Sequence, residues 1–320
     1  MQDPTAALAS VPLADHPTPV EELTRLREAL GAAPRLLIKR DDTIGFAFGG
    51  NKVRKMRLVA AEALRLGADT LITSGGIQSN HARVTAAAAA KLGLRCILVA
   101  NGAPPDRPTA NALLDALLGA DVRYVRDRAE RSAAMEAAAE EVRRAGRRPY
   151  VIPIGASTPL GAAAFVRAVA ELLAQIDPPD VIVHSTSSGG TQAGLVAGCA
   201  LARVKTKVLG ISADELAASL ERDVRAIIDG LPELIGGTAA QLAAGDVTVD
   251  DRFVGGGSGV PTAESREAIE LLARTEAIFL DPTYTSKAMA GLIARCRAGA
   301  FSPGDTVLFW HTGGQVGLFA

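Results

Sequence analysis

The sequence predicts an α/β protein built on mostly parallel β-sheets, and two observations lead to this class. First, short runs of β-branched and other apolar residues alternate with longer Ala- and Leu-rich stretches, a pattern typical of strands joined by helices. Strands joined in this way run parallel, and helices cover both faces of their sheet. Second, a chain of 320 residues, 48% of them hydrophobic, can bury two packed domains or one large α/β domain.

The first half of the chain fits this class element by element. A strand is expected at 35–39 and a helix at 53–67, where Met56, Val59, Ala60 and Leu64 share one face and a glycine stops the helix. A strand followed by a helix then recurs three times: strand 70–76 and helix 79–93, strand 95–102 and helix about 108–119, strand 122–125 and helix 128–146. We expect the run at 150–155 to be the strand that closes this block.

The second half continues the alternation with larger loops. Its expected elements are a helix at roughly 159–176, a strand at 180–185, a helix that begins near Thr191, and strands at 207–213 and 306–311. The segment 235–265 is glycine-rich and irregular, which indicates an excursion at the surface or at the edge of a pocket. If two domains exist, the chain crosses between them near residues 50–55 and again near 155–165.

Charge and composition argue against several classes of partner. A net charge of −1 and an aromatic content of 4% give no reason to expect nucleic acid or a membrane surface. The three cysteines lie far apart in apolar runs, as expected for buried thiols of a cytoplasmic protein: Cys96, Cys199 and Cys296. The four histidines are scattered, so no metal is expected. The N-terminal residues resemble no signal peptide, and no apolar stretch reaches the length of a membrane span.

The loop at 184–198 is the first candidate site. In a parallel sheet, ligands bind at the carboxyl ends of strands, near the N-termini of the following helices. Here small residues turn the chain into a helix, and the free N–H groups with the hydroxyls of Ser187, Ser188 and Thr191 suit an anion such as phosphate. The loop contains neither a Walker motif nor GxGxxG. Asp214 follows the next strand, which leaves a nicotinamide-binding alternative open.

Three further loops carry polar side chains at expected strand ends. Gly75 and Gly76 allow a close turn before Gln78, Ser79 and Asn80, which present two amides and a hydroxyl where a helix begins. Later in the chain, Tyr284 and Thr312 also follow strands, and a phenol in such a place can carry a proton or contact a substrate. These groups are expected to face a ligand.

Lys52 follows a Gly-Gly-Asn turn, which sets it apart from its basic neighbours. A solvated helix face would account for Arg54, Lys55 and Arg57, but not for a lysine held by so close a turn. A lysine, a phosphate site and opposing polar loops suit pyridoxal phosphate, because a lysine amine forms a Schiff base with its aldehyde. We expect the helix N-terminus and the nearby cations Arg54 and Lys55 to disfavour the ammonium form of Lys52.

Together these segments resemble the D-cysteine desulfhydrase and 1-aminocyclopropane-1-carboxylate deaminase family, which belongs to the tryptophan-synthase-β-like (fold type II) pyridoxal phosphate enzymes. The segments are GGNKVRK, SGGIQSNH, SGGTQAG, DPTYTSKAMAG and HTGG. The resemblance implies two three-layer α/β domains with mostly parallel sheets and the cofactor in the cleft between them. Residues 1–52 and 160–320 would form the larger, cofactor-binding domain and residues 53–159 the smaller one. It also implies a homodimer.

The same resemblance implies roles for individual residues. Lys52 would be the Schiff-base lysine, Ser79 would also move protons, and Tyr284 would face the reacting side of the substrate. The implied cofactor contacts are Lys52, Lys55, Asn80, Ser188, Gly189, Gly190, Thr191, Thr285 and Thr312. The implied substrate contacts are Gln78, Ser79, Asn80, Ser258 and Tyr284.

Three positions bear on the reaction. The deaminase branch carries a glutamate where this chain has Thr285, and the desulfhydrase branch carries threonines there and at Thr312. A carboxylate beside the ring nitrogen makes a strong electron sink that suits ring opening, whereas a neutral hydroxyl suffices when a good β-leaving group departs. Ser258 stands where both branches generally have a tyrosine, so the substrate is expected to differ from D-cysteine in size or leaving group.

The sequence therefore predicts a cytoplasmic lyase that carries out β-elimination on a small amino acid. In the simplest case a thiol leaves, with pyruvate and ammonia as further products. Several alternatives stay open: a 1-aminocyclopropane-1-carboxylate deaminase, a sulfo-lyase acting on cysteate, a racemase or dehydratase, and a relative that binds the cofactor without turnover.

Overall fold

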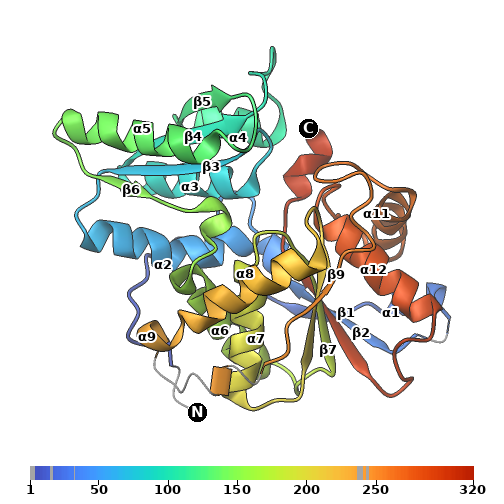
Figure 1. The fold of residues 1–320 in the computed structure, drawn as a ribbon. Helices are drawn as coiled ribbons and strands as arrows, with labels where there is room; N and C mark the ends of the chain where they lie inside the picture. Colours follow the sequence, from blue (N-terminus) through green and yellow to red (C-terminus); the bar gives the residue numbers. More distant parts are fainter. Residues whose placement is uncertain (1–3, 15–16, 32, 236–240, 243–244) are drawn as a thin grey trace.

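The chain forms two β-sheets with helices on their faces (Figure 1). The computed structural model describes residues 4–14, 17–31, 33–235, 241–242 and 245–320. Within this part, one sheet has six strands in the order β1-β2-β10-β7-β8-β9, and the other has four in the order β5-β4-β3-β6. The predicted α/β class with mostly parallel sheets is confirmed, because only the pairing of β1 with β2 is antiparallel.

The six-stranded sheet brings together strands from both ends of the sequence. Its strands are β1 (Val20–Glu22), β2 (Arg35–Arg40), β7 (Val181–Thr186), β8 (Lys207–Ser212), β9 (Thr248–Asp250) and β10 (Thr306–His311). The last strand, β10, lies between β2 and β7, and its residues from Val307 to His311 are buried. The sheet is therefore complete only when residues far apart in the sequence have paired.

Helices cover both faces of this sheet. On one face a core cluster joins residues of α6 (Pro159–Leu173), α7 (Gly190–Ala202), α8 (Ala217–Asp229) and α9 (Pro232–Ile235) to strand residues such as Ile182 and Trp310. On the other face a second cluster takes its residues from α1 (Thr24–Ala29), α11 (Ala263–Glu276) and α12 (Thr285–Arg297), together with Val183 and Phe309. Neighbouring residues of one strand thus point into different cores, as the period of a strand requires.

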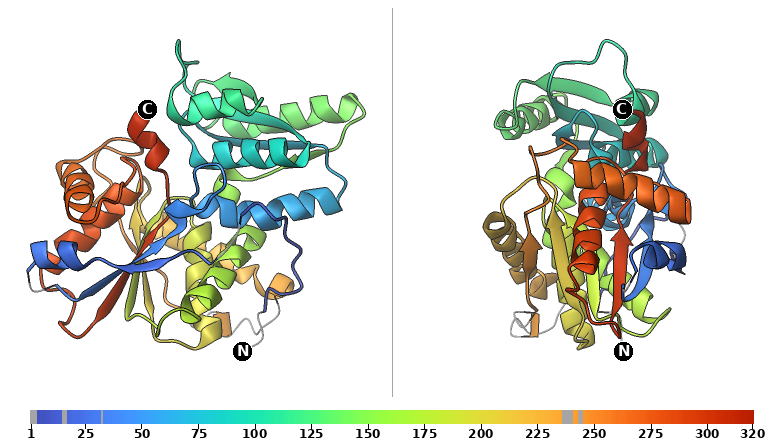
Figure 2. Two further views of the ribbon diagram at one scale, coloured as in Figure 1. Left: turned by 180° about the vertical axis from the view of Figure 1, so that it is seen from behind. Right: turned by 90° about the vertical axis from the view of Figure 1, so that its right-hand side faces the viewer.

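The four-stranded sheet is parallel throughout and lies within residues 70–151. Its strands are β3 (Thr70–Gly76), β4 (Arg95–Asn101), β5 (Asp121–Val125) and β6 (Pro149–Val151). Its helices are α3 (Asn80–Leu92), α4 (Ala110–Leu117) and α5 (Arg131–Arg144). Figure 2 shows this sheet and its helices beside the larger sheet. The C-terminal turn η3 (Gln315–Phe319) packs against α4, so the end of the chain reaches this smaller unit.

Helix α2 (Asn51–Arg65) connects the two units. It packs against α3 of the smaller unit and against α6 of the larger one. Asn51 and Lys52 form its first turn, so they lie at the junction between the two sheets. The division of the chain into domains at residues 52/53 and 159/160 stays a prediction.

Most predicted elements are present, with shifted ends. The helix predicted at 53–67 begins earlier, because Gly50 already turns the chain into it. The strand predicted at 150–155 is wrong in its second half, because the chain leaves β6 and forms the turn η2 (Ile154–Ala156). The irregular segment 235–265 contains β9, which was not predicted, and its residues 236–240 and 243–244 lie outside the described residues. All three cysteines are buried and unpaired, as predicted.

No helix in the described part of the chain combines the length and the apolar character needed to cross a membrane.

Candidate active site

A cleft of about 1150 Å³ opens where strand ends of both sheets face each other. Its walls come from the segments after β3, β4, β6, β7, β8 and β10, and the first turn of α2 lies in it. The cleft is larger than the usual range of small-ligand pockets, so a cofactor and a substrate can occupy it together. These predicted site residues line it: Lys52, Gln78, Ser79, Asn80, Ser188, Gly189, Thr191, Ser258, Tyr284 and Thr312.

Lys52 enters the cleft from a turn that only glycine can make. Gly50 has φ 100°, and a Cβ atom there would lie 2.9 Å from the carbonyl oxygen of Thr312. The next residue, Asn51, donates its backbone N–H to the same carbonyl at 2.9 Å. Lys52 forms no side-chain hydrogen bond in the described structure. Burial lowers the pKa of its amine to about 8, which confirms the expected direction.

The expected cause of that shift was wrong, because burial lowers the pKa of Lys52 and the charges of Arg54 and Lys55 do not. The solvated helix face expected for Arg54 and Lys55 is wrong as well. The guanidinium of Arg54 is buried and points away from the cleft, into the carboxylates of Asp41 and Glu171 at 2.8 Å each. Lys55 is buried as well, and its Nζ donates to the carbonyl oxygen of Gly155 at 3.0 Å. Burial, and then the charge of Lys52, hold the pKa of Lys55 well below its usual value.

The turn before α7 forms a close backbone cradle. Gly189 has φ 77°, and a Cβ atom at Gly190 would lie 2.8 Å from both Lys55 Nζ and Ser157 Oγ. The hydroxyl of Ser157 donates to Ser188 Oγ at 2.7 Å and accepts the backbone N–H of Gly190 at 3.2 Å. Gly190 and Lys55 therefore stand behind the cleft wall rather than in it. A helix N-terminus with hydroxyls and a buried lysine beside it suits a phosphate group.

The turn after β3 fixes the direction of its amide and hydroxyl groups. The side-chain oxygen of Asn80 accepts from Arg83 at 3.1 Å and from Asn111 at 2.9 Å, which leaves its NH₂ group as a donor for the cleft. Ser79 Oγ accepts the backbone N–H of Ala82 at 3.2 Å and keeps its own proton available. The amide of Gln78 is held by the 109–111 segment, at 3.2 Å from Thr109 O and 2.9 Å from Asn111 N.

The strand expected before Tyr284 is absent, because residues 277–281 have no regular secondary structure. Asp281 instead holds the turn that carries Tyr284. Its carboxylate accepts the backbone N–H groups of Thr283, Tyr284 and Thr285 at 2.7–2.9 Å. Burial, with the charges of Asp281 and Asp214 adding to it, raises the pKa of the Tyr284 phenol to about 12. The hydroxyl of Thr285 donates to Asp281 at 2.6 Å and does not line the cleft.

Several functional candidates were missed from the sequence. Asn51 donates its side-chain amide to Thr191 at 3.0 Å and so links the lysine turn to the phosphate cradle. Ser157, His81, Arg128 and Arg131 also line the cleft. His81 stands inside the SGGIQSNH segment, which is the one signal that could have drawn attention to it; the other three have no local signature. Within the described residues, no cluster of three or more His, Cys, Asp or Glu side chains could hold a metal ion.

Comparison with known proteins identifies a family. Residues 11–313 match the family described as pyridoxal-phosphate dependent enzyme. A solved structure described as an ACC deaminase homologue is 37% identical in sequence, with a TM-score of 0.90, and the match covers 99% of this chain and 95% of that one. The residues of the cleft fit the cofactor of the family: the cradle before α7 suits its phosphate, the Asn80 amide suits its ring oxygen, and Lys52 has a free amine.

Two more distant structures share the fold. One is a threonine deaminase, isoform 2 from Solanum lycopersicum, which is 18% identical with a TM-score of 0.70 over 98% of this chain and 82% of that one. The other is described as a pyridoxal 5′-phosphate-dependent aspartate racemase, which is 17% identical with a TM-score of 0.69 over 93% and 90%. Both likenesses concern the arrangement of sheets and helices.

Proposed function

The chain belongs to the family of pyridoxal-phosphate-dependent enzymes, and on that premise we propose that it is a lyase acting by β-elimination on a small amino acid. The leaving group is a thiol or a similar group, as in a D-cysteine desulfhydrase. The observation that supports this best is the position of Lys52, a largely buried amine with a pKa of about 8 that lies in one cleft with Asn80 and Tyr284.

Different residues of the cleft would hold different groups of the cofactor. When bound, pyridoxal phosphate supplies an aldehyde that links to an amine and a ring that draws electrons from the bonds at Cα. In this proposal Lys52 carries the cofactor through its ε-nitrogen. The N-terminus of α7, with Ser188 and Thr191, holds the phosphate, and the NH₂ group of Asn80 donates to the ring hydroxyl.

The remaining residues orient the amino acid and move protons. Ser79 donates its free proton to the substrate carboxylate, beside Gln78. The amine of Lys52 would remove the Cα proton, because an amine with a pKa of about 8 is partly neutral near neutral pH. Tyr284 keeps its proton at that pH and donates a hydrogen bond on the side where the β-substituent leaves.

The elimination balances without an oxidant or a reductant. The electron pair of the Cα–H bond becomes the second Cα–Cβ bond, and the pair of the Cβ–S bond leaves on sulfur. The enamine that is released takes up water and gives pyruvate and ammonia. Thr285 and Thr312 support elimination over ring opening, because neither brings a carboxylate to the cleft.

A spectrum and a substrate screen test this function. Protein produced with vitamin B6 should absorb in the visible near-violet, and it should release a 2-oxo acid from D- or L-cysteine, β-chloroalanine, cysteate or serine. Lys52→Ala should lose both signals, whereas Lys91→Ala, on the exposed side of α3, should keep both. A near-violet band that persists in Lys52→Ala would remove Lys52 from the proposed role.

The second candidate is a 1-aminocyclopropane-1-carboxylate deaminase. It is favoured by the relative of 37% identity, which is described as an ACC deaminase homologue. Release of 2-oxobutyrate from the cyclopropane amino acid would support this candidate, and its absence together with pyruvate from cysteine would support elimination. We also propose that the protein is cytoplasmic and forms a homodimer. Sedimentation of the purified protein would test the dimer.

A further inference from the structure

A buried lysine joins α12 to two of the segments that line the cleft. Lys287 lies in the first turn of α12, and its side chain is fully buried. Its Nζ donates to the backbone carbonyl oxygens of Ala213 at 2.9 Å, Val254 at 2.8 Å and Gly257 at 2.7 Å. Ala213 directly follows β8, whereas the other two carbonyls belong to residues 254–259, which we call the Ser258 loop.

The three contacts require that Lys287 is charged. An ammonium has three N–H donors and no acceptor, whereas a neutral amine has two donors and a lone pair that a third carbonyl oxygen would repel. Burial lowers the pKa of Lys287, and the charges of Asp214 and Asp281 oppose that shift. Lys287 does not line the cleft, and its three donors are all in use. Its ammonium therefore holds backbone and does not contact a ligand.

The Ser258 loop depends on this ammonium for its shape. Four of its six residues are glycine, and Gly257 has φ 111°, a conformation that other residues rarely adopt. A glycine-rich segment has many accessible conformations, so contacts must hold it in one of them. Within the part of the chain that the structure describes, Lys287 makes the only side-chain hydrogen bonds to this loop. Ser258 itself is exposed and lines the cleft.

The same ammonium sets the spacing of two other cleft groups. Asp214 directly follows Ala213, and Tyr284 lies about one turn before Lys287. Both Asp214 and Tyr284 line the cleft. Because Lys287 holds both segments to the helix that begins after Tyr284, the distances between these cleft groups are fixed from behind the cleft wall.

We propose that Lys287 is a positioning residue for substrate binding, because it holds the Ser258 loop and the segment before Asp214 at the positions where they meet the amino acid. It acts through the backbone of these two segments and touches neither substrate nor cofactor. The proposal rests on the proposed function, since it concerns the amino acid that this cleft binds.

Lys287→Met tests the ammonium and keeps most of the side-chain volume. D- and L-alanine have no leaving group, and their binding to the cofactor-loaded protein can be followed through the near-violet absorbance. Both should bind the variant more weakly by roughly 10-fold to 100-fold, the order of loss that misplaced binding groups cause. For any amino acid that is eliminated, KM should rise by a similar factor and kcat should change less. Lys287→Arg keeps the charge and the N–H donors, so it should retain part of the affinity.

Hydrogen exchange distinguishes a loosened loop from general destabilisation. Backbone amides of residues 254–260 should exchange faster in Lys287→Met, while those of β7 and α7 should keep their rates. Arg297→Gln is the matched control, because it removes a positive charge from the last residue of the same helix, where a half-exposed side chain pairs with Glu267. This control should change neither exchange nor affinity. Unchanged alanine affinity in Lys287→Met, or exchange that rises equally throughout the larger sheet, would overturn the proposal.

The outcomes also separate this proposal from the proposed function. If no amino acid yields a 2-oxo acid, but Lys287→Met binds alanine more weakly and exchanges faster at 254–260, the elimination is wrong and the positioning role stands. If the unmodified protein carries out the elimination and Lys287→Met keeps its KM and kcat, the positioning role is wrong and the elimination stands.

Discussion

The hydrogen bonds around His81 show which of its ring nitrogens carries the proton. The hydroxyl of Thr73 has one proton, and it donates it to the carbonyl oxygen of Ile152 at 2.7 Å. Thr73 can therefore only accept from His81 Nε2, 2.9 Å away, so that nitrogen carries the ring proton. Burial, followed by the charges of Lys52 and Lys55, holds the pKa of His81 well below its usual value. The ring is neutral, and Nδ1 is an acceptor with no partner in the described structure.

We predict that His81 stays neutral and protonated on Nε2 between about pH 5 and 8, the range in which an ordinary histidine titrates. Nitrogen NMR of protein labelled in its four histidines should show this form, with the His81 signal identified by its loss in His81→Gln. Thr73→Val removes the hydroxyl that accepts from His81 Nε2. The ring of that variant should therefore also populate the form protonated on Nδ1. A His81 signal that titrates near the ordinary value would contradict the assignment.

Residues of the strand-end loops could be predicted from the sequence, whereas buried charges could not. Gln78 and Ser79 follow the glycines at the end of β3, and such a turn indicates where a helix begins next to a sheet edge. Arg54 has no such signal. Its partner Glu171 lies 117 positions away in sequence, and only the packing of α2 against α6 brings the two together.

At the scale of elements, the start of α7 depends on the absence of a side chain. Gly190 is packed between Lys55 and Ser157, and the atoms on both sides are themselves held by hydrogen bonds. Neither neighbour can move without breaking a contact of the cradle.

Gly190→Ala should therefore weaken cofactor binding, by about 5-fold to 150-fold if overpacking costs roughly 1–3 kcal/mol. The measurement is the dissociation constant of pyridoxal phosphate in the refilled apoprotein. Gly304→Ala is the control, because a Cβ atom there meets nothing within 4 Å and its φ lies outside the left-handed region. Unchanged affinity in Gly190→Ala would mean that the phosphate binds elsewhere.

Among the strands, those that the sequence did not predict are the shortest ones. β1 and β9 have three residues each, too few to establish an alternating pattern. β6 was predicted too long, because its apolar residues continue into Pro153 and the turn after it. Longer helices such as α3 and α5 were found from their apolar period and their terminal glycines.

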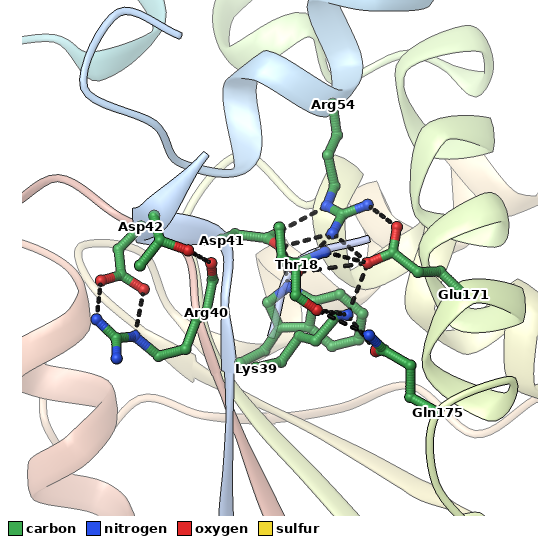
Figure 3. Close-up of polar contacts among 10 residues, drawn as sticks. Thr18, Lys39, Arg40, Asp41, Asp42, Arg54, Glu171 and Gln175 are labelled. Carbon is green, nitrogen blue, oxygen red and sulfur yellow. Dashed lines mark hydrogen bonds and ion pairs between the residues drawn. The ribbon is translucent and has the colours of Figure 1, made fainter. Parts of the chain in front are cut away.

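At the scale of the whole molecule, a buried network anchors α2 to the larger sheet (Figure 3). Arg54 donates to Asp41 and Glu171, and Lys39 donates to Glu171 at 2.6 Å. Trp310 of β10 donates its indole N–H to Asp41 at 2.8 Å. The helix that begins with Lys52 is thereby tied to β2, α6 and β10 at once.

Arg54→Met should cost about 3–5 kcal/mol of unfolding free energy, because it leaves buried carboxylates without their partner. Denaturant unfolding of the variant measures this cost. Arg65→Met, at the exposed end of the same helix, removes a surface ion pair with Glu62 and should change stability far less. Equal effects of the two substitutions would show that the network does not hold α2.

The same network should make the free energy of unfolding depend on pH in the acid range. Burial alone would raise the pKa of Glu171, but hydrogen bonds and charges from Arg54 and Lys39 outweigh it and lower that pKa to about 2. A lowered carboxyl pKa contributes stability that is complete above the ordinary value of 4.5 and is lost as the pH falls toward 2. In Glu171→Gln, the free energy of unfolding, measured with denaturant at several pH values, should change less between pH 4.5 and pH 2 than in the unmodified protein.

The pairing of β10 has a consequence for how the protein is made. This strand completes the centre of the larger sheet, and the carbonyl that supports the Lys52 turn belongs to Thr312, directly after it. During translation the ribosome releases residues 306–312 almost three hundred positions after β1 has emerged. Until then β2 and β7 have no strand between them, so we expect the nascent chain to bind the cofactor only after β10 has been released.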